Sequence, residues 1–154
     1  MPTPMIIDDH FSKRERDLAL TRRLFDERSV AIATLLGSTL AGGALMYYNA
    51  RQLGRGDGPK HLAVAFAIAA GVIALAFVLP ASIPGIGYSI AQLLALRAYY
   101  MSTQHPAVAA HAEAGGVIGS RWLAAGVGLV GLVVMGGLIL VVVLATTDGP
   151  LVAF

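Results

Sequence analysis

The chain has 154 residues, of which 56% are hydrophobic and only 13% are charged, and its mean hydropathy is +0.72. An ordinary soluble domain carries roughly 25% charged residues, so this chain has too few charges to build a hydrated surface. Six of its 11 Lys and Arg residues precede residue 29, and long uncharged stretches make up most of the remainder. These features predict an integral membrane protein with three or four membrane segments, because each spanning helix needs about 20 apolar residues.

Composition also excludes several functional classes. The chain has no cysteine, which removes disulfide frameworks, thiolate zinc sites and thiol nucleophiles. Its net charge of +2 is too small to indicate a nucleic-acid partner, and it is explained more simply by basic residues held at the cytoplasmic face of a membrane. The first apolar run has 22 residues, longer than the roughly 7–15 residues of a signal-peptide core, so we expect it to be retained.

The N-terminal region, residues 1–28, is predicted to be a charged cytoplasmic segment. Asp8 and Asp9 can cap a helix that runs to about Arg28 along the membrane surface. Opposite charges stand four residues apart on this helix, where they meet on one face, at Lys13–Asp17, Arg22–Asp26 and Arg23–Glu27.

Four apolar segments follow in a membrane domain that covers residues 29–146, ahead of a short tail at 147–154. The run from 62 to 96 has no charge, and as one helix its 35 residues would be about 52 Å long, against a hydrocarbon core of about 30 Å. It must therefore fold back, and Pro80 and Pro84 mark the turn. The predicted segments are 29–50, 62–79, 85–101 and 122–145.

The first segment decides the architecture. If 29–50 spans the membrane, six basic residues lie on one side and five on the other. If it is a re-entrant hairpin, all 11 lie in the cytoplasm, as the positive-inside rule prefers. The hairpin would break in the glycine-rich centre of the segment, at Gly37, Ser38, Gly42 and Gly43, where Gly42 and Gly43 are expected to supply the backbone freedom that a tight turn needs. Its tip would have to be enclosed by an oligomer or a large partner. A glycine-interrupted full span is the alternative, and the sequence leaves both open.

Small residues supply the candidate site. Re-entrant Gly, Ser and Thr backbone can line a pore or bind a solute, although close helix packing explains the same composition. These candidates are Gly37, Ser38, Thr39, Gly42 and Gly43. Small residues also recur every four positions, which favours close helix contacts within or between chains. The three stripes are Ala33–Gly37–Ala41, Ala63–Ala67–Gly71 and Ser120–Ala124–Gly128, with Gly71, Ala124 and Gly128 as the predicted contact points.

No catalytic or metal site is predicted. The interiors of the apolar segments contain no Asp, Glu, Lys or His, which disfavours both an enzyme and a proton-coupled pump. His61, His105, His111 and Glu113 lack a metal-binding pattern, so we expect solvated loop residues. No cofactor is expected.

The stretch LAGGALMYYNARQLGR (residues 40–55) joins a Gly pair, two aromatics, an Asn and a basic loop. In this respect the chain resembles small polytopic membrane proteins of bacteria that have no established function. The resemblance implies a bacterial inner membrane and no activity. We therefore expect an all-α membrane protein with three transmembrane helices, a re-entrant or fourth spanning segment and a cytoplasmic N-terminus. In the lipid bilayer it would form a homo-oligomer with a channel-like path for ions or a small solute. The alternative is a non-transporting accessory or immunity-type protein that binds a larger membrane protein.

Overall fold

The computed structural model describes residues 7–147 except 81 and 83, and this part of the chain is helical, with one isolated β-bridge between Leu24 and Ile118. Residues 148–154 of the predicted tail and the first six residues lie outside the described residues, whereas Thr147 is the last residue of helix α7. The helices are α1 (Ile7–Leu20), α2 (Glu27–Gly37), α3 (Thr39–Gln52), α4 (Gly58–Val78), α5 (Gly85–Thr103), α6 (His105–Glu113) and α7 (Arg121–Thr147).

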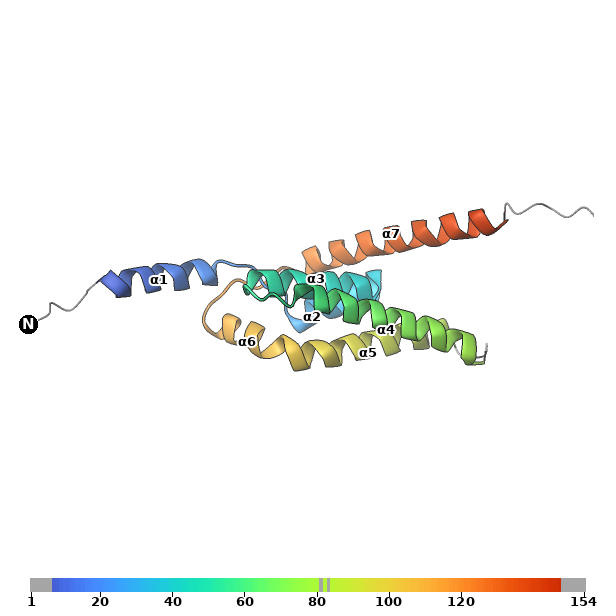
Figure 1. Ribbon diagram of the computed structural model, residues 1–154, viewed down its shortest axis with the longest axis horizontal. Helices are drawn as coiled ribbons and strands as arrows, with labels where there is room; N and C mark the ends of the chain where they lie inside the picture. The colour runs from blue at the N-terminus through green and yellow to red at the C-terminus, as the bar shows by residue number, and fades with distance from the viewer. Residues whose placement is uncertain (1–6, 81, 83, 148–154) are drawn as a thin grey trace, which may run out of the picture.

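The N-terminal helix is shorter than predicted. Helix α1 ends at Leu20 rather than near Arg28, and in Figure 1 it projects away from the end of the bundle along its long axis. Leu24 and Phe25 explain the early end, because both are buried in the core and the chain must extend to place them there. The Leu24 amide donates to the Val117 carbonyl at 3.0 Å, which pairs this linker with the segment before α7.

The short helices α2 and α3 lie at the centre of the bundle, and the longer helices α4, α5 and α7 run past them along the long axis (Figure 1). Helix α7 packs mainly on α2, α4 mainly on α3, and α5 contacts both α2 and α4. Far from α1, the outer halves of α4, α5 and α7 extend beyond the two central helices (Figure 1).

Two helices, α4 and the α7 stretch Arg121–Ala145, are long and apolar enough to cross a membrane. Their most apolar windows have mean hydropathies of 2.4 and 3.0, yet only 11% and 6% of those windows are buried inside the protein. The core helix of a soluble protein would be mostly buried, so this exposure points to an apolar environment around the molecule. Helix α5 forms where the third segment was expected, but it is less apolar and is not one of these two helices.

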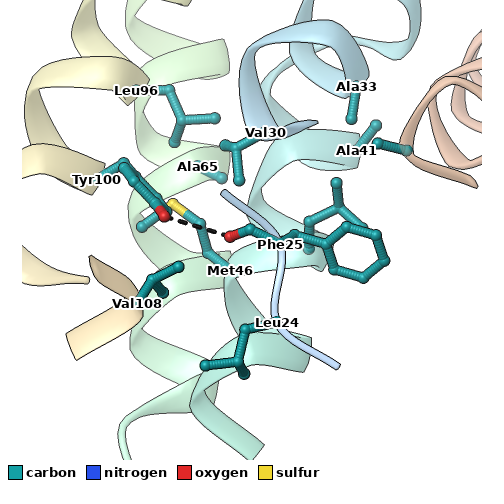
Figure 2. Packing of buried hydrophobic residues seen from close by; sticks show 12 residues of the cluster. Leu24, Phe25, Val30, Ala33, Ala41, Met46, Ala65, Leu96, Tyr100 and Val108 are labelled. Atoms are coloured by element: carbon teal, nitrogen blue, oxygen red, sulfur yellow. Dashed lines mark hydrogen bonds between the residues drawn. The ribbon is translucent and has the colours of Figure 1, made fainter. Parts of the chain in front are cut away.

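The core lies in the half of the bundle nearer to α1, where the central helices meet their neighbours. Figure 2 shows side chains from α2 to α6 converging there, with small alanines allowing close approach of the helix backbones. The buried cluster comprises Leu24, Phe25, Val30, Ala33, Ala41, Leu45, Met46, Ala65, Leu96, Tyr100, Val108 and Ala124.

Candidate functional site

Helices α2 and α3 form an antiparallel hairpin. At its base, the Phe25 amide donates to Asn49 Oδ1 at 2.8 Å, and Asn49 Nδ2 donates to the Phe25 carbonyl at 2.8 Å. Farther along, Thr34 of the first arm lies directly against Gly42 of the second. Positions near the start of α2 therefore meet positions near the end of α3, and the segment 29–50 folds back on itself.

The hairpin turns at a single residue, Ser38. Its backbone has φ 86° and ψ 170°, a region that is essentially restricted to glycine and costs other residues about 1–3 kcal/mol. The Ser38 amide donates to the Thr34 carbonyl at 3.0 Å, and the Ser38 hydroxyl accepts from the Leu40 amide at 3.3 Å. One residue thus ends α2 and begins α3.

The turn falls within the predicted glycine-rich centre, but the expectation that Gly42 and Gly43 supply its backbone freedom is wrong, because both glycines lie inside α3. They are needed for space. A Cβ added at Gly43 would lie 2.4 Å from the Ala65 Cβ of α4, and one at Gly42 would lie 2.0 Å from Thr34 Oγ1. At these two positions α3 therefore lies too close to α2 and to α4 for any residue other than glycine.

Glycine also sets the contact between the hairpin and α7. A Cβ at Gly37 would lie 2.2 Å from the Gly128 carbonyl oxygen, and a Cβ at Gly128 would lie 3.1 Å from the Ala33 carbonyl oxygen. Ala124 is fully buried one turn before Gly128. The stripes on α2 and α7 thus meet within one chain. Gly71 differs, since a Cβ there would meet nothing within 4 Å, and its stripe on α4 is exposed.

A cavity of about 200 Å³ lies at the hairpin tip, between α2, the turn, α5 and α7. Ser38 reaches it from the turn, and Ser89 and Gln92 reach it from α5. Hydroxyl and amide groups both donate and accept hydrogen bonds, so these three side chains can bind a polar molecule without charge. The remaining lining residues are Thr34, Leu35, Leu36, Gly37, Leu132 and Met135, and no charged residue is among them.

Thr39, the remaining sequence candidate, does not line this cavity. Its side chain is fully buried, and Thr39 Oγ1 has no hydrogen-bond partner among the described residues. The structure therefore brings Gly37 and Ser38 to the tip cavity, buries Thr39, and places Gly42 and Gly43 in helix contacts.

A buried polar network at the base of the hairpin was missed by the sequence analysis. Asn49 Nδ2 also donates to Gln104 Oε1 at 3.2 Å, and Gln104 Nε2 donates to the Met46 carbonyl at 2.7 Å. The Tyr100 hydroxyl donates to the Phe25 carbonyl at 3.2 Å, as the dashed line in Figure 2 shows. Asn49 and Gln104 are fully buried, so these bonds satisfy amides that would otherwise be costly to bury. The available signal was that Asn49 is the only asparagine in the chain.

Charged groups gather at this same base. Arg97 Nε donates to Glu27 Oε1 at 2.5 Å and joins α5 to α2, which replaces the predicted Arg23–Glu27 pair. Arg55 pairs with Asp57 at 2.7 Å in the loop before α4. The base is therefore polar and held by ion pairs, whereas the tip is uncharged.

His61 and His111 make contacts within the protein rather than being solvated loop residues as expected, and both lie in helices. His61 is buried, with Nδ1 at 3.0 Å from the Tyr99 hydroxyl and Nε2 at 3.6 Å from Asp57 Oδ1. His111 Nε2 lies 3.0 Å from the Arg22 carbonyl oxygen. Within the described residues, no group of three His, Asp or Glu side chains gathers where it could hold a metal ion.

Comparison of the chain with protein-family models, curated proteins and solved structures gives no match.

Proposed function

We propose that the chain is an inner-membrane protein in which α4, α5 and α7 span the bilayer and the hairpin enters and leaves on the cytoplasmic side. Support comes from the distribution of charge along the long axis. All 11 Lys and Arg residues lie toward the end from which α1 projects, and none lies in the described part of the opposite end (Figure 1). They are Lys13, Arg14, Arg16, Arg22, Arg23, Arg28, Arg51, Arg55, Lys60, Arg97 and Arg121.

The arm lengths support partial penetration of the membrane. Helices α2 and α3 have 11 and 14 residues, which gives lengths of about 16 and 21 Å against a hydrocarbon core of about 30 Å. The tip then lies near the middle of the bilayer. Non-helical backbone is tolerated at that depth only when protein or water covers it, and α5 and α7 flank Ser38.

The function we propose is passage of a small uncharged polar solute, with the tip cavity as the binding site. The observation that carries this proposal is the backbone of Ser38. Glycine would adopt φ 86° at lower free energy, but serine, unlike glycine, brings a hydroxyl to the cavity beside Ser89 and Gln92. Strained residues of this kind cluster at functional sites. A volume of about 200 Å³, below the roughly 300–1,000 Å³ of larger ligand pockets, favours a solute of a few atoms.

A homo-oligomer would complete the path. Within one chain, the glycine contacts pack the hairpin closely against α4 and α7. A continuous route for the solute would therefore have to run between copies of the chain. The exposed stripe of Ala63, Ala67 and Gly71 on α4 offers a close contact for a second copy. The same stripe favours the second candidate, a non-transporting accessory or immunity-type protein that binds a larger membrane protein.

Reconstitution tests the solute path. Full-length protein in liposomes is mixed with urea or with glycerol in a stopped-flow instrument, and the rate of volume change is compared with that of protein-free vesicles. We expect faster equilibration for at least one probe, reduced by Ser89→Ala and by Gln92→Leu. Ser102→Ala is the matched control, because it removes a hydroxyl from the base of the same helix, where the Ser102 hydroxyl donates to the Tyr99 carbonyl of that helix.

Equal rates with and without protein for both probes would contradict the solute path. The particle mass in mild detergent then separates the remaining proposals: a multiple of the 16.0 kDa chain supports self-assembly, and a stable complex with one larger membrane protein supports the accessory role.

A further inference from the structure

A second, larger cavity of about 710 Å³ lies at the basic end of the bundle. It is an open groove between the linker after α1, the last turns of α3 and the first turns of α7. This groove is separate from the hairpin tip and shares no lining residue with it. Its lining residues are Thr21, Arg22, Arg23, Phe25, Ala44, Leu45, Tyr48, Gln52, Leu123 and Val127.

The rim of the groove is cationic. Arg22 and Arg23 both line it, and no carboxylate does. Arg22 is anchored, because its Nη1 donates to the Gln52 carbonyl at 2.6 Å and crosses from the linker to α3. The exposed side chain of Arg23 makes no hydrogen bond or ion pair with the described residues. Neither guanidinium group is paired with a carboxylate of the described residues, so both can donate hydrogen bonds to a bound anion with several oxygen acceptors.

The walls of the groove are apolar and continue into surface that the proposed orientation exposes to lipid. Leu45 and Phe25 form its buried floor, and Leu123 and Val127 belong to the first turns of α7. Tyr48 in the groove and Trp122, which precedes the lining residue Leu123 in the chain, are exposed, the latter by 87%. Aromatic side chains of this kind are enriched where hydrocarbon meets headgroups.

We propose that this groove binds one phospholipid with an anionic headgroup, whose phosphate lies against Arg22 and Arg23 and whose acyl chain lies along α3 and α7. Basic pockets between membrane helices on the cytoplasmic side bind such headgroups through the same combination of charge and apolar surface. The bound lipid would hold the linker against α7 and fill the open side of the hairpin. This proposal rests on the membrane orientation above but not on the solute path.

Native mass spectrometry of the full-length protein in detergent tests the proposal. Phosphatidylglycerol and phosphatidylcholine of matched acyl chains are titrated separately, and apparent dissociation constants are read from the adduct intensities. We expect tighter binding of phosphatidylglycerol. Arg22→Gln/Arg23→Gln should weaken it on the order of tenfold, while Lys13→Gln/Arg14→Gln, which removes the same charge from the projecting helix α1, should leave it unchanged.

A second variant tests the contribution of the apolar part of the groove independently of the two arginines. Ala44→Phe fills the apolar part without touching either arginine, and it should lower the adduct level of phosphatidylglycerol while leaving the thermal unfolding temperature without added lipid unchanged. Inorganic phosphate should not compete at millimolar concentration. Equal losses in both double variants, competition by phosphate, or retention of lipid by Ala44→Phe would each overturn the proposal. Neither double variant should alter urea or glycerol flux, so the two proposals can fail independently.

Discussion

Gly43 shows how one missing methyl group fixes the distance between two helices. A Cβ there would lie 2.4 Å from the Ala65 Cβ, and a methyl attached directly to a helix backbone cannot rotate away. We expect Gly43→Ala to lower the free energy of unfolding by about 1–3 kcal/mol, because α3 and α4 must separate. The gain of up to about 1 kcal/mol in helix propensity offsets part of this loss. Thermal unfolding in detergent measures the change.

Two matched variants make this prediction specific. Ala65→Gly in the Gly43→Ala background moves the methyl from one helix to the other, so stability should be largely recovered. Gly71→Ala on α4 places a methyl where nothing lies within 4 Å, and it should be neutral or stabilising in the monomer. If the double variant is no more stable than Gly43→Ala alone, Gly43 is not required for this contact.

At Ser38 the backbone conformation lowers stability, whereas the side chain serves the proposed solute path. Ser38→Gly removes the backbone strain of φ 86° and should raise the free energy of unfolding by about 1 kcal/mol or more, while it slows the flux of the small solute. Ser38→Val should destabilise the hairpin, since a β-branched side chain is poorly tolerated at positive φ. Unfolding temperature and liposome flux are measured on the same preparations. A Ser38→Gly protein with unchanged flux would remove the functional reason for a serine at this position.

The sequence assigned the backbone freedom of the turn to Gly42 and Gly43, but a glycine pair can supply either of two properties: freedom of φ or absence of volume. Composition does not distinguish them. Tertiary packing does, since Thr34 and Ala65 occupy the space in which a side chain would lie. Ser38 was singled out with its neighbours as backbone that can line a pore, but its role as the turn depends on the helices that meet around it.

At the scale of the element, the stability of the hairpin base depends on the side-chain amide of Asn49. We expect Asn49→Ala to lower the free energy of unfolding by about 1–3 kcal/mol, because the buried Phe25 amide loses its acceptor and Gln104 loses a partner. Gln52→Ala, on the same helix with a side chain that is only half-buried, is the control. Hydrogen exchange at Phe25 should accelerate in the first variant only; unchanged protection there would show that the Tyr100 network suffices.

The helix boundaries were largely predictable, and the reasons are local. Proline positions and the limit on helix length located the turn between α4 and α5. The region 21–26 was not predictable from the same signals. Its charges stand at helical spacing, but burial of Leu24 and Phe25 outweighs the small stabilisation that exposed i,i+4 pairs provide.

At the scale of the whole molecule, charge carried information that hydropathy did not. The count of 11 basic residues favoured a hairpin before any contact was known, because a full span would have divided them. The tip cavity and the groove lined by Arg22 and Arg23, here the arginine groove, could not be predicted in this way. Each combines residues from three separate parts of the chain, and no periodicity connects Ser38 to Gln92 or Arg23 to Val127.

The orientation is testable with single cysteines, since the chain has none of its own. We expect cysteines at Gly56 and Ala110 to be inaccessible to an impermeant thiol reagent on intact cells and to react after permeabilisation. A cysteine at Ser82, in the turn between α4 and α5, should react on intact cells. All three positions are exposed, and a Cβ at Gly56 meets nothing within 4 Å, so the substitutions should not perturb folding.

The pair of Gly56 and Ser82 is decisive because α4 alone separates them. If the hairpin returns to the cytoplasm, Gly56 lies on the same side as Ala110 and opposite to Ser82. If the segment 29–50 crossed the membrane instead, Gly56 would be labelled on intact cells along with Ala110, and Ser82 would not. Labelling of Gly56 without permeabilisation would therefore reject a hairpin that enters from the cytoplasm, and with it the placement of the arginine groove at the cytoplasmic headgroups.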